Sequence, residues 1–174
     1  TESGQLSQNA YAISIGYKAG EDTQGSSTIA IGRGAGQTTQ KNEAVAIGYL
    51  AGNSNQNSSA IAIGSSAGKD LQNTNTMAIG TDAGTTSQNA YAVAIGYKAG
   101  ESRQGGSATA IGRGAGQTNQ GSESVAIGYL AGQNNQHTNT IVLNATGANL
   151  NTAGTSRSYI KPLRVATVAS NVVS

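Results

Sequence analysis

A sixteen-residue repeat runs through most of this chain. The dipeptide Ile-Gly recurs at this constant step from Ile15-Gly16 to Ile127-Gly128, and Leu143-Asn144 takes the ninth place. Each Ile is followed four positions later by an Ala-Gly pair, as in Ala19-Gly20. A period this regular, without insertions, predicts a solenoid in which each repeat stacks on the one before it.

A longer period lies above the short one. The segment 7–11 (Ser-Gln-Asn-Ala-Tyr) returns at 87–91, and the segment 16–20 (Gly-Tyr-Lys-Ala-Gly) returns at 96–100. Both segments return after five whole repeats. Duplication of a five-repeat block explains this and indicates that the array lengthens by whole repeats.

Each repeat carries two apolar residues in alternation before its glycine, as in Ile13/Ile15 and Val45/Ile47. Alternating β-branched residues predict a short strand whose larger side chains face inward. Glycines then predict a turn, and the Asn or Gly that usually follows the repeat's glutamine predicts a second turn at positive φ. We therefore expect an all-β parallel solenoid of about nine rungs over residues 1–152, roughly 43 Å long at about 4.8 Å per rung.

Stacked rungs place identical residues on top of one another. The glutamines predict an amide ladder and the isoleucines an apolar spine. The glutamine ladder comprises Gln24, Gln40, Gln56, Gln72, Gln88, Gln104 and Gln120. The isoleucine spine comprises Ile31, Ile47, Ile63, Ile79, Ile95, Ile111 and Ile127.

The composition provides few residues for a core. Only 28 of the 174 residues are Ile, Leu or Val, below the roughly 20% of large apolar residues with which a chain normally folds alone. The opposite face of the predicted strand is almost uniformly alanine, from Ala30 to Ala126. Small residues there predict close approach by another chain, so we expect one strand face inside the coil and the other between coaxial copies of the protein.

The repeated Ala-Ile-Gly, as in residues 43–48 (Glu-Ala-Val-Ala-Ile-Gly) and 122–128 (Ser-Glu-Ser-Val-Ala-Ile-Gly), resembles the head repeats of YadA-like trimeric autotransporter adhesins. The resemblance covers residues from about 8 to 148. It implies a left-handed parallel β-roll assembled as an intertwined homotrimer, with attachment to surfaces or matrix as its task. The uniform sixteen-residue spacing departs from that family, whose rungs are commonly shorter or more variable.

A second, shorter resemblance lies in the C-terminal segment 153–174. Residues 156–165 (Ser-Arg-Ser-Tyr-Ile-Lys-Pro-Leu-Arg-Val) break the repeat and contain the only proline. They resemble the junction before the trimerising chaperone regions of phage tail fibres and of large-virus surface proteins. This resemblance implies a viral fibre or spike, with 153–174 leading to a further trimerisation or distal region.

The chain offers little for catalysis or metal binding. It has no cysteine, and its single histidine, His137, occupies a turn column otherwise held by Asn, Gly and Lys. The acidic residues form no recurrent pair of the kind that glycoside hydrolysis requires. We therefore expect no enzymatic activity, no metal and no cofactor.

Nucleic acid and membrane are not expected partners. The ten basic residues are scattered, whereas nucleic-acid binding needs clustered positive charge. No segment approaches the ~18 apolar residues of a spanning helix, so membrane insertion is not expected either.

One outward column contains aromatic and basic residues that stack in the predicted rungs. It reads Tyr17, Arg33, Tyr49 in the first half and Tyr97, Arg113, Tyr129 in the second. One interpretation is a cation–π stack that braces the surface. The other is a sugar-binding stripe, in which tyrosine rings stack on pyranose rings and arginine donates to hydroxyl or acidic groups.

These features predict a non-catalytic fibre segment on the outside of a cell or virion, with further copies of itself and a host glycan or matrix protein as partners. Two alternatives stay open. A glycan-processing fibre would need an acid pair shared between subunits. An ice-binding solenoid would need a recurrent threonine ladder, for which the pairs Thr74/Thr76 and Thr138/Thr140 are the only candidates in their columns.

Overall fold

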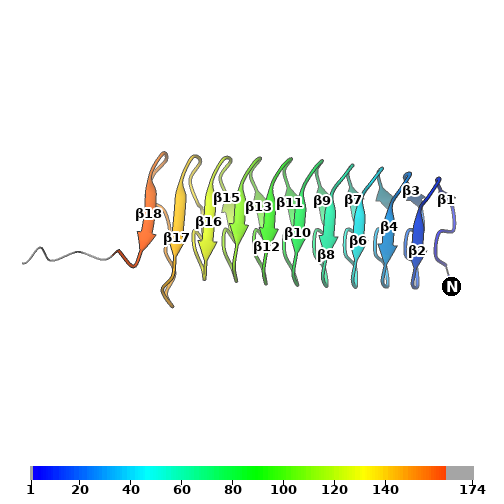
Figure 1. The fold of residues 1–174 in the computed structure, drawn as a ribbon, viewed down its shortest axis with the longest axis horizontal. Helices are drawn as coiled ribbons and strands as arrows, with labels where there is room; N and C mark the ends of the chain where they lie inside the picture. The colour runs from blue at the N-terminus through cyan, green and yellow to red at the C-terminus, as the bar shows by residue number, and fades with distance from the viewer. Residues whose placement is uncertain (1, 164–174) are drawn as a thin grey trace, which may run out of the picture.

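The computed structural model describes residues 2–163 as a rod of stacked coils (Figure 1). Within these residues the coils form two parallel sheets of eight and ten strands, and the last two strands of the larger sheet have no counterpart in the smaller one. The all-β solenoid predicted from the repeat is confirmed. It has about ten turns instead of nine, because the C-terminal segment adds a strand.

The ten-stranded sheet, called here the isoleucine sheet, is formed by the Ile-x-Ile segments. Its strands are β2 (Ile13–Ile15), β4 (Ile29–Ile31), β6 (Val45–Ile47), β8 (Ile61–Ile63), β10 (Met77–Ile79), β12 (Val93–Ile95), β14 (Thr109–Ile111), β16 (Val125–Gly128), β17 (Ile141–Asn144) and β18 (Ser158–Lys161). From β2 to β17 neighbouring strands pair at the repeat offset, as in Ile61 with Met77.

The eight-stranded sheet, called here the glutamine sheet, is formed by the segments that end in the repeat's glutamine. Its strands are β1 (Ser7–Gln8), β3 (Thr23–Gln24), β5 (Thr39–Gln40), β7 (Ser54–Gln56), β9 (Asp70–Gln72), β11 (Thr86–Gln88), β13 (Ser102–Gln104) and β15 (Thr118–Gln120). Glutamine pairs with glutamine along the whole sheet, as in Gln72 with Gln88.

The space between the sheets is filled by small residues and by the glutamines. The alanines at the middle of the isoleucine strands, such as Ala62 and Ala78, are fully buried, as are those of the Ala-Gly turns, such as Ala67. Gln72 crosses the interior, where its Nε2 donates to the carbonyl of Ile61 at 3.0 Å and to Oε1 of Gln88 at 3.1 Å.

The predicted amide ladder is confirmed. Six hydrogen bonds of 3.0–3.2 Å join consecutive glutamines from Gln24 to Gln120. The six glutamines from Gln24 to Gln104 are fully buried, and Gln120 is 3% exposed. The ladder ends at Gln120, because the buried Oε1 of the next glutamine, Gln136, has no hydrogen-bond partner in the described residues.

The predicted inward orientation of the isoleucines is wrong. Alanine faces the interior, and the flanking residues of each strand point outward. The outward positions Ile31, Ile47, Ile63, Ile79 and Ile95 are half-buried by their stacked neighbours, whereas Ile111 and Ile127 are 36% and 40% exposed.

The physical reason for this reversal is the narrow interior, which one glutamine side chain spans from sheet to sheet. Alanine fits there beside the glutamines, and a column of isoleucine would not. We call the outward columns, from Ile13 and Ile15 to Ile141 and Leu143, the isoleucine face.

The turns depend on two backbone features. The glycine after each isoleucine has a φ between +111° and +131°, and a Cβ built on Gly64 would lie 2.7 Å from the carbonyl carbon of Gly80. The sequence predicts the second positive-φ turn directly after the glutamine, but it lies three positions after it, at Ser59 and Asn75 for example. Directly after the glutamine, Gly25, Gly105 and Gly121 do not adopt a positive φ.

The sheet continues past the predicted boundary at residue 152. Strand β18 pairs with β17 and places Ser158 beside Ile141, so this last step is one position longer than the repeat. Residues 164–174 of the predicted C-terminal segment lie outside the described residues. In the described part of the chain, no helix has the length and apolar character to span a bilayer.

Candidate functional site

The predicted tyrosine–arginine column forms a stack in each half of the rod. In the first half the Arg33 guanidinium carbon lies 5.9 Å from the ring centroid of Tyr17 and 5.7 Å from that of Tyr49. In the second half Arg113 lies 5.9 Å from Tyr97 and 5.4 Å from Tyr129. These distances are within the range of cation–π attraction, so the predicted bracing stack is present.

A shallow cleft lies beside each stack. The first cleft has a volume of about 110 Å³ and the second about 330 Å³. The lining residues of the first recur in the second five repeats later: Tyr17/Tyr97, Lys18/Lys98, Arg33/Arg113, Gly34/Gly114, Gln37/Gln117, Tyr49/Tyr129 and Leu50/Leu130. The stripe predicted from sequence is therefore the wall of two clefts that have matching residues and different volumes.

A glycine and a leucine shape the floor of each cleft. Gly34 is buried at φ +66°, and a Cβ built on it would lie 2.7 Å from Cδ2 of Leu50. Gly114 has φ +65°, and its Cβ would lie 2.6 Å from Cδ2 of Leu130. The leucine therefore packs over a position where any other residue would displace it.

An ion pair fixes the lysine of each cleft. Lys18 Nζ lies 2.9 Å from Oε1 of Glu21, and Gln37 Nε2 donates to the other carboxylate oxygen at 2.6 Å. The hydrogen bond from Lys18, followed by that from Gln37, lowers the pKa of Glu21, and the same lysine–glutamate bond raises the pKa of Lys18. Lys18 also lies 3.4 Å from Oε2 of Glu2.

The second cleft repeats this pair. Lys98 Nζ lies 3.0 Å from Oε1 of Glu101, and Gln117 donates to Oε2 of Glu101 at 2.6 Å. The hydrogen bond to Glu101 raises the pKa of Lys98.

The arginines are held differently from the lysines. Arg33 and Arg113 are exposed, and within residues 2–163 neither guanidinium has a carboxylate or hydrogen-bond partner. The tyrosine rings hold each guanidinium by its faces, so its N–H groups remain free to bind an anion.

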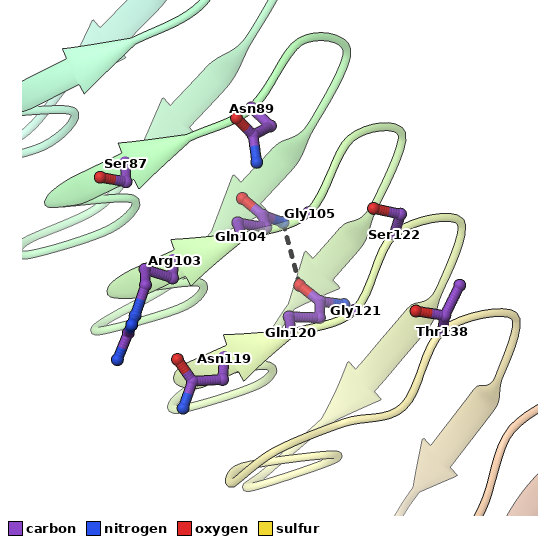
Figure 2. A pocket seen from close by; sticks show the side chains of 10 residues that line it. All are labelled: Ser87, Asn89, Arg103, Gln104, Gly105, Asn119, Gln120, Gly121, Ser122 and Thr138. Carbon is purple, nitrogen blue, oxygen red and sulfur yellow. Dashed lines mark hydrogen bonds between the residues drawn. The ribbon is translucent and has the colours of Figure 1, made fainter.

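A polar groove of about 460 Å³ forms a third hollow, on the second half of the rod. Figure 2 shows its lining residues on successive rungs, with the hydrogen bond from Gln104 to Gln120 among them. Arg103, Asn119 and Ser122 provide polar groups, and Gly105 and Gly121 leave the space open. The first half has Thr23 in place of Arg103 and Lys41 in place of Gly121, so these lining groups are not duplicated.

The remaining candidates have structural environments. His137 Nδ1 lies 2.7 Å from Oγ1 of Thr152 in a turn. Thr76 and Thr140 are buried, and each hydroxyl donates to a carbonyl three positions earlier. The threonine pairs proposed for ice binding therefore do not form an exposed ladder. No group of three or more His, Cys, Asp and Glu side chains suited to a metal ion occurs in residues 2–163.

Comparison of the chain with protein-family models, with curated proteins and with solved structures gives no match.

Sequence reasoning predicts the stripe but not the clefts. Lys18, Gly34, Gln37 and Leu50 do not form a uniform column, so stacking alone does not single them out. These four residues are identical in the second five-repeat block, whereas the neighbouring Asp22 is replaced there by Ser102. This selective identity between the two blocks is the sequence signal that could have identified the clefts.

Proposed function

We propose that the chain is a structural and adhesive fibre segment that assembles as a homotrimer and attaches to a host or matrix surface. In this proposal the fibre is extracellular or belongs to a virion, and the segment carries out no catalysis. The observation that carries the proposal is the isoleucine face, since a solenoid that folded as an isolated unit would have little reason to leave its largest apolar residues outside.

The isoleucine face is a continuous apolar stripe along the rod. It is two outward residues wide, about 7 Å, and at about 4.8 Å per rung it is roughly 43 Å long. The resulting ~300 Å² matches the largest apolar patch of a typical monomer, and patches of that size commonly mark interaction sites. Ile13, Ile15 and Ile141, at its two ends, are 43–58% exposed, and most of the outward residues between them are half-buried.

The narrowness of the face favours three copies over two. A stable pairwise interface buries about 800 Å² on each partner, which a stripe of this width does not supply alone. Three rods around one axis let each stripe contact two neighbours, and the flanking turns add to both contacts. A left-handed coil, as the family resemblance implies, belongs to this proposal.

The assembly is tested by sedimentation velocity on the wild type and on the double variant Ile63→Lys/Ile95→Lys. We expect a trimer for the wild type and a monomer for the variant, because two lysines per chain would be buried at the axis. Leu71→Lys is the control, since Leu71 is 53% exposed on β9 of the glutamine sheet. A monomeric wild type, or a trimer that survives the double substitution, contradicts the proposal.

Attachment is tested separately, by binding of the wild-type chain to host cells, matrix proteins and a glycan array. Saturable binding to at least one surface is expected. Absence of binding to all three, or turnover of a polysaccharide by the chain, would replace the adhesive function with a purely structural or an enzymatic one.

A further inference from the structure

The two clefts have the chemistry of a site for an acidic sugar. Each offers tyrosine rings 36–49% exposed. One face of each ring meets the arginine, and the exposed remainder can pack against the apolar face of a sugar ring. Each cleft also has one arginine without a carboxylate partner in residues 2–163, beside a lysine already paired with a glutamate.

The arginine of each cleft is suited to binding a sugar carboxylate. Its N–H groups form a planar fork that matches the two oxygens of a carboxylate, and the stacked rings hold that fork in place before a ligand arrives. The paired lysine lacks this freedom, because binding a second anion would compete with Glu21 or Glu101.

The two clefts are repeated along the rod at a fixed spacing. Arg33 and Arg113 are five rungs apart, and at about 4.8 Å per rung the separation is roughly 24 Å. Between the two clefts, from Tyr49 to Tyr97, the same outward column holds only Ser65 and Thr81, which offer neither a ring nor a positive charge. A single sugar occupies one cleft, whereas a polysaccharide of sufficient length reaches both.

We propose that the two clefts together bind one chain of an acidic polysaccharide, with a uronate carboxylate on Arg33 and another on Arg113. This inference deepens the proposed attachment function by naming its ligand class, and it rests on that function. Once the polysaccharide is bound at one cleft, its binding at the other is intramolecular. The overall affinity is therefore higher than that of either cleft alone.

The inference is tested by calorimetry with a galacturonate disaccharide and with long-chain polygalacturonate as the probes. We expect the long chain to bind the wild type roughly 100-fold more tightly per site than the disaccharide. Either Arg33→Gln or Arg113→Gln should bring long-chain affinity close to that of the disaccharide, and the double variant should lose binding.

Two controls distinguish this site from general charge attraction. Arg103→Gln removes the same charge from an exposed arginine on β13 of the glutamine sheet and should leave affinity within a factor of two. Arg33→Lys keeps the charge but not the fork, and should weaken long-chain binding nearly as much as Arg33→Gln. Equal losses for Arg103→Gln, or full binding by the double variant, would overturn the inference, as would a sialylated trisaccharide binding as tightly as the long chain.

The same variants separate this inference from the fibre proposal. If the wild type is a trimer that attaches to surfaces but does not bind polygalacturonate, the ligand class is wrong and the function stands. If polygalacturonate binds through both arginines but the protein neither forms trimers nor attaches to any surface, the clefts are confirmed and the attachment function is wrong.

Discussion

Each buried glutamine connects three parts of the molecule. Gln72 starts from the glutamine sheet, donates to the backbone of Ile61 in the isoleucine sheet, and bonds to the glutamines of the rungs on either side. A side chain with both a donor and an acceptor can continue such a chain of bonds indefinitely. The ladder therefore fixes the rungs to one another in addition to the backbone hydrogen bonds.

Removing one amide from this ladder should be costly. In Gln72→Ala the buried Oε1 of Gln88 loses its donor and the carbonyl of Ile61 loses the bond from Gln72, whereas Gln56 Nε2 keeps its bonds to two backbone carbonyls. We expect a loss of about 2–4 kcal/mol in the free energy of unfolding, at about 1–3 kcal/mol for each unsatisfied group. Urea unfolding at fixed protein concentration measures it.

The adjacent residue provides the control for Gln72→Ala. Leu71 is 53% exposed and has φ +56°, a conformation that asparagine adopts more readily than leucine. Leu71→Asn should stay within about 0.5 kcal/mol of the wild type. A loss in Leu71→Asn that equals the loss in Gln72→Ala would mean that the ladder is not the source of the stability.

The ion pair of the first cleft gives a pH-dependent prediction. The pKa of Glu21 lies below its ordinary value of 4.5, chiefly because of its hydrogen bond with Lys18. A lowered pKa in the folded state means that the pair stabilises the fold above the ordinary pKa, and that this contribution is lost as the pH falls through the folded-state pKa. Lys18→Met should move the pKa of Glu21 upward, measured by carbon NMR of its carboxyl group. An unchanged pKa would show that Gln37 alone holds the carboxylate.

At the scale of the rung, the turn glycines set the distance between neighbours. The recurrence of glycine at this position correctly predicts a turn, because a glycine that returns in every repeat usually marks one. The predicted position of the second turn is wrong. Ser59, Glu43 and Tyr91 have a positive φ although they are not glycines. Hydrogen bonds between coils impose this conformation, so the residue types alone could not predict it.

Substitution of a turn glycine should disrupt the stack locally. In Gly64→Ala the new Cβ would lie 2.7 Å from both the carbonyl carbon and oxygen of Gly80, at φ +129°. We expect a loss of about 1–3 kcal/mol from the backbone conformation alone, with the contact adding to it, as measured by thermal unfolding. Gly106→Ala is the matched control, since its nearest contact is 3.6 Å away. It should leave stability within about 0.5 kcal/mol, and equal losses in both variants would refute a role for the close contact.

At the scale of the whole molecule, the repeat determines the parallel stack and the register, but not which strand face lies inside. The alternating pattern places Ala62 on one strand face and Ile61 and Ile63 on the other, but it does not show which face points into the coil. The usual preference for burying the larger apolar residues favours the isoleucines. The information lies instead in the glutamine column, because a buried Gln72 that bonds across the coil leaves room only for alanine.

The array should tolerate the loss of a complete rung and no other small deletion. Removing residues 61–76 places Met77 beside Val45, so alanine still faces inward and each remaining rung keeps a neighbour. We expect circular dichroism per residue to be unchanged and the rod to shorten by about 4.8 Å in solution scattering. Removing residues 61–75 instead turns Met77 into the interior. If that variant is as stable as the sixteen-residue deletion, the interior does not require small residues.

The uniform stack also determines how such a rod would respond to a pulling force. The hydrogen bonds between rungs run along the rod axis, so tension applied at the ends acts on all inter-rung junctions in series, and the junctions release one after another. Each released coil could extend from about 4.8 Å to about 54 Å of chain. Under load the rod would lengthen in equal steps, as a tether that absorbs mechanical work before it breaks.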